Sequence, residues 1–295
     1  MDSMKRTIVT ILSTNFAGSH YLSLILGSHS HAMHIGEIHH LRRAHKREYS
    51  CSVCADPKQC PLARRVTPET IDRVYDIIFE NVSNPAITTL VDTSKKVAWA
   101  SRFVGQPGYR MKYIHLIRDP RALVRRWMVT YETAPKKRSV RWKTARHVPR
   151  QFFRILRGPE WKVYLYKWLW QNQEITHFLA RHGVDAQVLS YREVALDTEA
   201  TVAKIERWLG EDFEPSQLEY WNVAHHGTQK ESYDWVKQQQ TRYFDLRWQS
   251  FLSPDLQTDI LTHPEVATYL DALGFVPVGD GLARKPVPTS ANPGV

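Results

Sequence analysis

Short runs of β-branched and aromatic residues alternate along the chain with longer segments whose apolar residues recur at helical spacing. The strand-like runs cover residues 7–12, 87–92, 112–117 and 186–191. Helical patterns separate and follow them, at residues 18–29, 68–82, 160–183 and 197–210. This alternation predicts an α/β fold with a central, mostly parallel sheet flanked by helices.

The chain of 295 residues, of which 42% are hydrophobic, is long enough to bury a substantial core. We therefore expect a single α/β domain over residues 1–275. Residues 132–170 are strongly basic with aromatic interruptions, and we interpret them as a helical lid on that domain. Residues 276–295 are rich in proline and glycine, so we expect a disordered tail there.

The 40 basic and 30 acidic residues give the chain a formal charge of +10. Such a charge favours polyanionic partners, namely nucleotides, sulfated or acidic sugars, nucleic acid or an anionic membrane surface, without choosing among them. No apolar run is long enough to cross a bilayer, and the N-terminus lacks the apolar stretch of a signal peptide. We therefore expect a cytoplasmic protein.

The three cysteines, Cys51, Cys54 and Cys60, lie close together in the sequence. An odd, clustered set is a poor disulfide framework for a cytosolic chain. The Cys-x-x-Cys pair and the third cysteine could hold zinc if a histidine such as His45 completed four ligands. The alternative is a folded loop with reduced thiols, and we otherwise expect no metal.

The segment STNFAGSHYL, residues 13–22, follows the first strand-like run and leads into the first helix. A strand, a small-residue turn and a helix bring backbone N–H groups, here at positions 17–20, up to an anion. The ATP-binding pattern G-x-x-x-x-G-K-[ST] is absent. The turn therefore predicts an anion site that does not need a magnesium-bound triphosphate.

Charged residues follow two further strand-like runs. The sequence YIHLIRDPRALVRRW ends one strand at Arg118 and starts a helix with Asp-Pro. The sequence LVDTSKK brings Ser94 and Lys95 to the end of another strand. Open α/β sheets bind ligands at the carboxyl ends of their strands. There Arg118 and Arg121 could clamp a phosphate, and Lys95 could stabilise charge on a leaving group.

Taken together, these stretches resemble the sulfotransferases that use 3′-phosphoadenosine-5′-phosphosulfate (PAPS), over about residues 7–248. STNFAGSHYL is similar to the family's loop for the 5′-phosphosulfate, and IRDPRALVRRW to its element for the 3′-phosphate. Four more stretches are similar to segments of the family and follow one another in the family's order: CSVCADPKQCP, VDTSK, LSYREVALDTEATVAKIERWLG and HHGTQK…FDLRWQSFLS. The resemblance implies a P-loop-like sulfotransferase architecture and in-line transfer of a sulfuryl group to a hydroxyl.

The resemblance also implies site residues. Contacts to the donor fall on Ala17, Gly18, Ser19, His20, Tyr21, Arg118, Arg126, Tyr191, Gln229 and Lys230, the last three being weaker candidates. Glu37 in HIGEIHH takes the place of the family's general base, His39 is the second candidate, and His40 is expected to face elsewhere. Lys95 is the expected cation at the leaving oxygen.

Three positions depart from the family pattern. Phe16 stands where a lysine or arginine usually precedes the loop glycine, and His20 where a hydroxyl residue is usual. We expect either that His20 supplies part of the missing positive charge or that the loop binds the donor more weakly. Arg126 stands where the family has a serine for the 3′-phosphate, and an inward-pointing arginine could replace that contact.

The acceptor is less constrained by the sequence. The basic, aromatic segment could gather an anionic glycan, or could rest on the inner face of an anionic membrane that carries a lipid-linked acceptor. The leading function is transfer from PAPS to a hydroxyl of a carbohydrate, glycolipid or other acceptor, with PAPS and its product PAP as partners and without nucleic acid. The alternatives are an ATP-dependent phosphotransferase, a polyanion-binding protein and a sulfotransferase fold that has lost catalysis.

Overall fold

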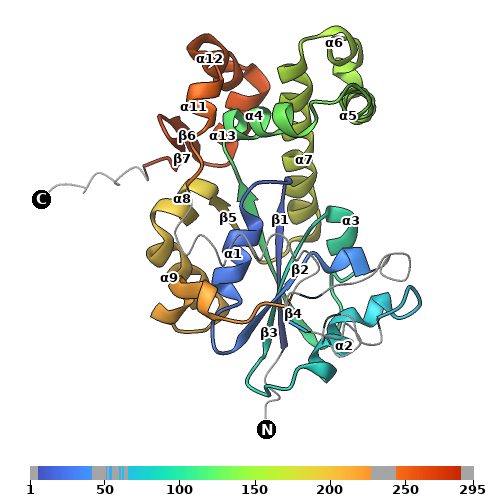
Figure 1. The fold of residues 1–295 in the computed structure, drawn as a ribbon, viewed down its shortest axis with the longest axis vertical. Helices are drawn as coiled ribbons and strands as arrows, with labels where there is room; N and C mark the ends of the chain where they lie inside the picture. Colours follow the sequence, from blue (N-terminus) through green and yellow to red (C-terminus); the bar gives the residue numbers. More distant parts are fainter. Residues whose placement is uncertain are drawn as a thin grey trace, which may run out of the picture. The chain divides into compact units, whose positions relative to one another are not determined.

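The computed structural model of the chain describes residues 6–41, 51, 53–54, 60, 62, 66–226 and 244–286. These residues form two compact units, each from two stretches of the chain. Unit 1 comes from Met1–Ile117 and Trp170–Phe244, and unit 2 from Arg118–Leu169 and Asp245–Val295. Figure 1 shows the elements of both units. Within the described ranges, no helix is long and apolar enough to span a membrane.

Unit 1 is built on a five-stranded sheet whose paired strands all run parallel, in the order β2-β3-β1-β4-β5. The strands are β1 (Arg6–Ser13), β2 (Ala32–Gly36), β3 (Thr89–Lys95), β4 (Tyr109–Ile117) and β5 (Ala186–Ser190). The four predicted strand runs fall on β1, β3, β4 and β5, and the predicted α/β class is confirmed. The sequence did not predict β2, because AMHIG contains no run of β-branched residues.

Helices cover both faces of this sheet (Figure 1). The helical elements of unit 1 are α1 (Ser19–Leu26), η3 (Ile71–Arg73), α2 (Val74–Asn81), α3 (Val97–Ala100), α8 (Tyr191–Leu196), α9 (Thr198–Leu209), η5 (Pro215–Asn222) and the second part of α7 (Glu160–His182). Side chains of β1 alternate between two cores, since Val9 and Ile11 pack with α1, α8 and α9 whereas Ile8 packs with α2 and α3. Burial on both faces explains why β1 is a nearly continuous apolar run.

The described part of unit 2 is helical apart from one β hairpin. Its elements are α4 (Pro120–Thr130), α5 (Ala134–His147), η4 (Pro149–Gln151), α6 (Phe152–Arg157), the first part of α7, α11 (Trp248–Phe251), α12 (Pro254–Thr262), α13 (Pro264–Ala272), β6 (Phe275–Val278) and β7 (Gly281–Arg284). The Asp119 carboxylate caps α4 by accepting the Arg121 N–H at 2.8 Å. Trp168 of α7 packs edge-on against Tyr269 of α13, with ring centroids 5.7 Å apart.

The prediction of a disordered tail from residue 276 is wrong for the first part of that tail. β6 and β7 pair as an antiparallel hairpin, with Phe275 opposite Arg284 and Val278 opposite Gly281. Phe275 is buried, and the Arg284 guanidinium lies 4.4 Å from the centre of its ring. Of the glycines that suggested disorder, Gly279 lies in the turn of the hairpin and Gly281 begins β7. Residues 287–295 lie outside the described residues.

Candidate active site

Four strands of unit 1 bring candidate residues to one edge of the sheet. Because the strands are parallel, their carboxyl ends lie on the same edge. β1 leads into the loop at residues 14–18, β2 into Glu37 and β5 into Tyr191, whereas β3 ends at Lys95. β1 has β3 on one side and β4 on the other, so its end is the topological switch point of the sheet. Open α/β sheets bind ligands at such a point.

The loop after β1 contains two residues with positive φ. Gly18, directly before α1, has a φ of 99°, and Phe16 has a φ of 71°. A Cβ atom on residue 18 would lie 2.5 and 2.8 Å from ring atoms of Tyr191, so only glycine allows this approach. The structure thus brings two predicted site residues, Gly18 and Tyr191, into contact. Positive φ in a residue such as Phe16 is uncommon and occurs preferentially at functional sites.

The end of this loop offers hydrogen-bond donors that fit an anion. No side chain of the described residues caps the N-terminus of α1, which begins at Ser19. The hydroxyls of Ser13 and Thr14 are buried and have no hydrogen-bond partner among the described residues. Lys96 Nζ lies 3.4 Å from the side-chain oxygen of Asn15, and sequence reasoning did not identify this cation at the loop. The uncapped helix, the hydroxyls and the lysine fit an anion.

Two further residues that the sequence predicted to contact the sulfuryl donor, Ala17 and Tyr21, make contacts with other residues near the loop. The Ala17 N–H donates to the Thr14 carbonyl oxygen at 3.3 Å and so closes the turn before Gly18. The ring of Tyr21 packs edge-on against Tyr220 of η5, with centroids 5.6 Å apart. Ala17 therefore shapes the loop, and Tyr21 joins α1 to η5.

His20, the second residue of α1, does not supply the positive charge that the sequence suggested. Its ring meets that of His34 edge-on, with centroids 5.1 Å apart. Burial, with the charge of Lys95 nearby, lowers the pKa of His20 to about 4. The ring is therefore neutral near pH 7, which does not favour the first of the two expectations, a positive charge on His20. Lys96, in contrast, contacts the loop through the side-chain oxygen of Asn15.

Glu37 and Lys95, predicted separately from sequence, form an ion pair. The Lys95 ammonium donates to Glu37 Oε1, and the two side chains are only 14% and 10% exposed, respectively. His40 Nε2 lies 3.6 Å from the other carboxylate oxygen, so the expectation that His40 faces elsewhere is wrong. Burial raises the pKa of Glu37, but His40 and Lys95 outweigh it and lower that pKa to about 2. Glu37 is therefore ionised near neutral pH.

His39 lies beside this pair and remains a second candidate for the base. Its backbone N–H donates to Ser94 Oγ at 3.1 Å, and its ring lies on that of His40, with centroids 4.0 Å apart. Its Nδ1 is buried without a hydrogen-bond partner in the described part of the chain. Burial and His40 lower the pKa of His39 to about 4, so the ring is neutral near pH 7. Glu37, His39 and His40 hold ligand atoms within 4.8 Å of one another, but Lys95 already neutralises Glu37.

A buried carboxylate that sequence reasoning missed, Asp92, fixes the end of β3. It accepts hydrogen bonds from the Tyr75 hydroxyl at 2.7 Å, the Trp99 indole at 2.8 Å and the Ser94 N–H at 2.7 Å. Lys95 follows it with a φ of 63°. A strained backbone of this kind persists where the surrounding structure determines it, and the contacts of Asp92 supply that support.

Replacing Asp92 with alanine is expected to lower the free energy of unfolding by about 3 kcal/mol, because three buried donors lose their acceptor. Urea unfolding at pH 7.5 measures this change. Asp72 pairs with Arg102 at the surface and is 72% exposed, so Asp72→Ala is a matched control with an expected change below about 1 kcal/mol. Equal stability of the two variants would contradict the role of Asp92.

Unit 2 contains a cluster of arginines that begins with Arg118, directly after β4. Arg118 Nη2 lies 3.0 Å from the Asp245 carboxylate, and Arg247 binds the same carboxylate through two nitrogens, at 2.8 and 3.0 Å. Burial and then Arg247 lower the pKa of Arg126, so Arg126 is close to the same charges. Three arginines around one carboxylate leave an excess of positive charge that fits a phosphate. Sequence reasoning did not assign Asp245 or Arg247 to a site.

Three other residues that the sequence predicted to bind the donor or its phosphate have a structural role or lie outside the described residues. Arg121 pairs with Asp119 at 2.7 Å and donates to the Val278 carbonyl oxygen at 2.7 Å, so its side chain joins α4 to β6. Gln229 and Lys230 are among the residues that the structure does not describe.

Comparison of the structure with solved structures identifies the fold. The chain is similar to the sulfotransferase domain from the curacin biosynthetic pathway, with 17% sequence identity, a TM-score of 0.55, and coverage of 91% of this chain and 97% of that one. It is also similar to the sulfotransferase domain from the Synechococcus PCC 7002 olefin synthase, with 18% identity, a TM-score of 0.52, and coverage of 90% and 94%. No protein-family model and no curated protein sequence matches the chain. The predicted fold is confirmed: the chain has the sulfotransferase fold.

Proposed function

We propose that the protein transfers the sulfuryl group of PAPS to a hydroxyl acceptor. The observation that carries this proposal is the Glu37–Lys95 ion pair at the carboxyl edge of a sheet with the sulfotransferase fold. A carboxylate and an ammonium group side by side supply the two functions that in-line transfer to a hydroxyl requires. When bound, PAPS would supply the transferable group and a phosphate leaving group.

Each residue at this edge receives a defined role in the proposal. The first turn of α1, from Ser19, and Lys96 bind the anionic end of the donor, because the helix terminus and the ammonium both attract negative charge. Glu37 accepts the proton of the acceptor hydroxyl, and Lys95 stabilises the charge that develops on the leaving oxygen. Tyr191, in contact with Gly18, shapes the donor site.

Replacing Lys95 with methionine is expected to lower turnover about 100-fold, because a preorganised cation at a developing charge contributes at least this factor. The rate of PAP release from PAPS in the presence of a hydroxyl acceptor measures the change. Lys112→Met is a matched control, since Lys112 is also buried and paired with a carboxylate, that of Asp185. An equal loss of turnover in both variants would assign the effect of Lys95 to folding.

In unit 2 we propose that Arg118 and Arg126 bind the 3′-phosphate, as the sequence resemblance implies, with Arg247 as a further contact. Arg118→Ala is expected to weaken PAP binding about 10- to 100-fold, because a hydrogen bond to a charged group contributes about 1.5–3 kcal/mol. Binding of adenosine-5′-phosphate should change little. Titration calorimetry compares the two nucleotides, with Arg150→Ala as a control on an exposed arginine of η4. Equal losses for both nucleotides would exclude a 3′-phosphate role.

The proposed acceptor is a hydroxyl of an anionic glycan or of a lipid-linked compound. α5 and α6 carry many basic residues, together with the exposed rings of Trp142 (51%) and Phe153 (68%). Basic and aromatic side chains together suit sugars, which stack on rings, or an anionic membrane surface. We propose that residues 132–170 act as the lid that collects this acceptor.

Titration calorimetry of the full chain with PAP, without magnesium, tests the donor class. A parallel titration uses ATP with magnesium. We expect tight binding of PAP and weak binding of ATP. Preference for ATP with magnesium would instead support a phosphotransferase, and binding of neither nucleotide would support a fold that has lost catalysis.

A further inference from the structure

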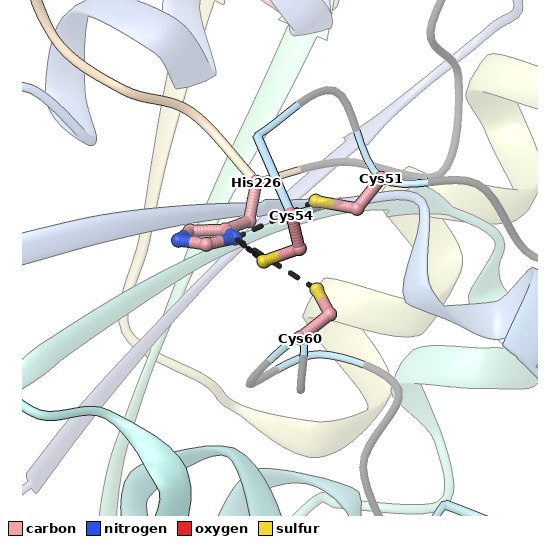
Figure 2. A group of neighbouring side chains, drawn as sticks. All are labelled: Cys51, Cys54, Cys60 and His226. Carbon is pink, nitrogen blue, oxygen red and sulfur yellow. Dashed lines mark hydrogen bonds between the residues drawn. The ribbon is translucent and has the colours of Figure 1, made fainter. Parts of the chain in front are cut away.

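Three cysteines and one histidine from distant parts of the sequence converge in unit 1 (Figure 2). Cys51, Cys54 and Cys60 come from the segment between β2 and α2, and His226 follows η5. His226 is 166 residues from Cys60 in the sequence, so the cluster joins two otherwise separate segments of the chain. The sequence suggested His45 as the fourth ligand, but His45 lies outside the described residues.

The distances within the cluster fit a tetrahedral ligand set. The distances from His226 Nδ1 to the sulfur atoms of Cys51, Cys54 and Cys60 are 3.5, 3.4 and 3.8 Å. A zinc ion bound to sulfur at about 2.3 Å and to nitrogen at about 2.0 Å in a tetrahedral arrangement separates these two ligand atoms by about 3.5 Å. All four ligand atoms lie within 4.8 Å of one another, so a single ion can contact all of them.

Hydrogen bonding alone does not account for this arrangement. An imidazole nitrogen carries either one proton or one lone pair, and either points in one direction in the plane of the ring. Three sulfur atoms around one nitrogen, as Figure 2 shows, cannot all lie in that direction. The cysteines are also not paired with one another as disulfides. A cation at the centre of the four atoms satisfies all of them at once.

The surroundings favour a structural ion. Cys60 is fully buried, Cys51 is 8% exposed, and both belong to the hydrophobic core that includes Ile35 of β2 and Tyr75 of α2. Four protein ligands close a tetrahedral site, whereas a catalytic zinc keeps one position open for water or substrate. Thiolate and imidazole ligands in a tetrahedral set favour zinc over magnesium or calcium, which prefer oxygen ligands.

We propose that Cys51, Cys54, Cys60 and His226 bind one structural Zn²⁺ ion, which joins the segment between β2 and α2 to the segment after η5. The site is independent of the proposed sulfuryl transfer, because it shares no residue with the Glu37–Lys95 pair. Binding requires three thiolates and a neutral imidazole, so zinc uptake releases protons from the thiols. Because the ligands are far apart in sequence, metal binding stabilises the folded chain over the unfolded one.

Elemental analysis of the full chain, purified without a histidine tag or chelator, tests the proposal. We expect one zinc per chain. Loss of a residue that only hydrogen-bonds to a metal ligand lowers metal affinity roughly 10- to 100-fold. Cys54→Ser and His226→Ala each remove a ligand itself, so we expect a larger loss of zinc affinity from each. Val53→Ser changes an exposed side chain in the same segment, and His177→Ala removes an exposed histidine of α7. Both controls should retain the metal.

Two measurements on the unchanged chain keep the test decisive if a variant fails to fold. Chelation of the metal should lower the melting temperature, and added zinc should restore it. Cobalt in place of zinc should give the visible absorption of a tetrahedral ion with thiolate ligands. Absence of stoichiometric zinc after titration with Zn²⁺, iron in place of zinc, or a disulfide among the three cysteines would each overturn the proposal.

Discussion

Glu37→Gln is expected to lower the turnover of sulfuryl transfer by a factor of about 10² to 10⁴, the range that a positioned general base contributes. Glutamine keeps the shape of the side chain and can still accept a hydrogen bond from Lys95, but it cannot accept a proton from the acceptor. PAP binding should stay close to that of the unchanged protein, because Glu37 acts on the acceptor. PAP release from PAPS measures turnover, and calorimetry with PAP measures binding.

His39, the neighbour of Glu37, is the alternative general base, and substitutions at the two positions distinguish them. The contacts of Glu37 with His40 and Lys95 hold its pKa at about 2, so the carboxylate is ionised but weakly basic. His39 is neutral, with a pKa of about 4 and a buried Nδ1, and is therefore the competing base. We expect the His39→Gln variant to keep most of the turnover of the unchanged protein, whereas the Glu37→Gln variant loses it. The reverse result, with His39→Gln inactive and Glu37→Gln active, would transfer the base to His39.

The sequence predicted this edge of the sheet better than it predicted the contacts there. Hydrophobic runs located β1, β3, β4 and β5, strand ends placed Gly18 and Lys95 at the edge, and the family resemblance added Tyr191. β2 is only Ala32–Gly36, too short and too poor in β-branched residues to be recognised. Glu37 was therefore assigned by family resemblance, and its pairing with Lys95 emerged only from the structure.

The remaining differences depend on burial and on contacts between distant residues. The low pKa of His20 was not visible in the sequence, because the burial that desolvates a ring cannot be seen in a local pattern. The role of Asp92 is not visible in VDTSK, because two of its three buried donors, Tyr75 and Trp99, come from outside this segment. His226 joins the cysteines across 166 residues of sequence, a separation over which spacing carries no information.

Buried histidines are expected to make the protein lose stability in mild acid. His34 on β2 is 1% exposed and His115 on β4 is fully buried. Burial lowers the pKa of His115 to about 4 and that of His34 well below its ordinary value. The unfolded chain therefore binds more protons than the folded one below about pH 6.5, so stability is complete above that pH and falls with acidification.

The size of this loss of stability between pH 7.5 and pH 5 is set by the protons that the histidines bind in the unfolded chain. With a folded pKa of about 4, His115 lowers the free energy of unfolding by about 2 kcal/mol over this range, and His34 acts in the same direction. Glu206 acts in the opposite sense, because burial raises its pKa to about 7 and the folded state then gains protons first. Urea unfolding at several pH values measures the net dependence.

Two substitutions with opposite expected signs separate these contributions. His115→Gln removes one proton-binding group of the unfolded chain, so the loss of stability between pH 7.5 and pH 5 should shrink by about 2 kcal/mol, even if the variant is less stable throughout. Glu206→Gln keeps the side chain next to Gln217 and removes the opposing group, so the loss should become larger. His177→Gln, at an exposed position on α7, should leave the pH dependence unchanged. An unaltered pH dependence in His115→Gln would mean that His115 takes up a proton in the folded protein as readily as in the unfolded chain.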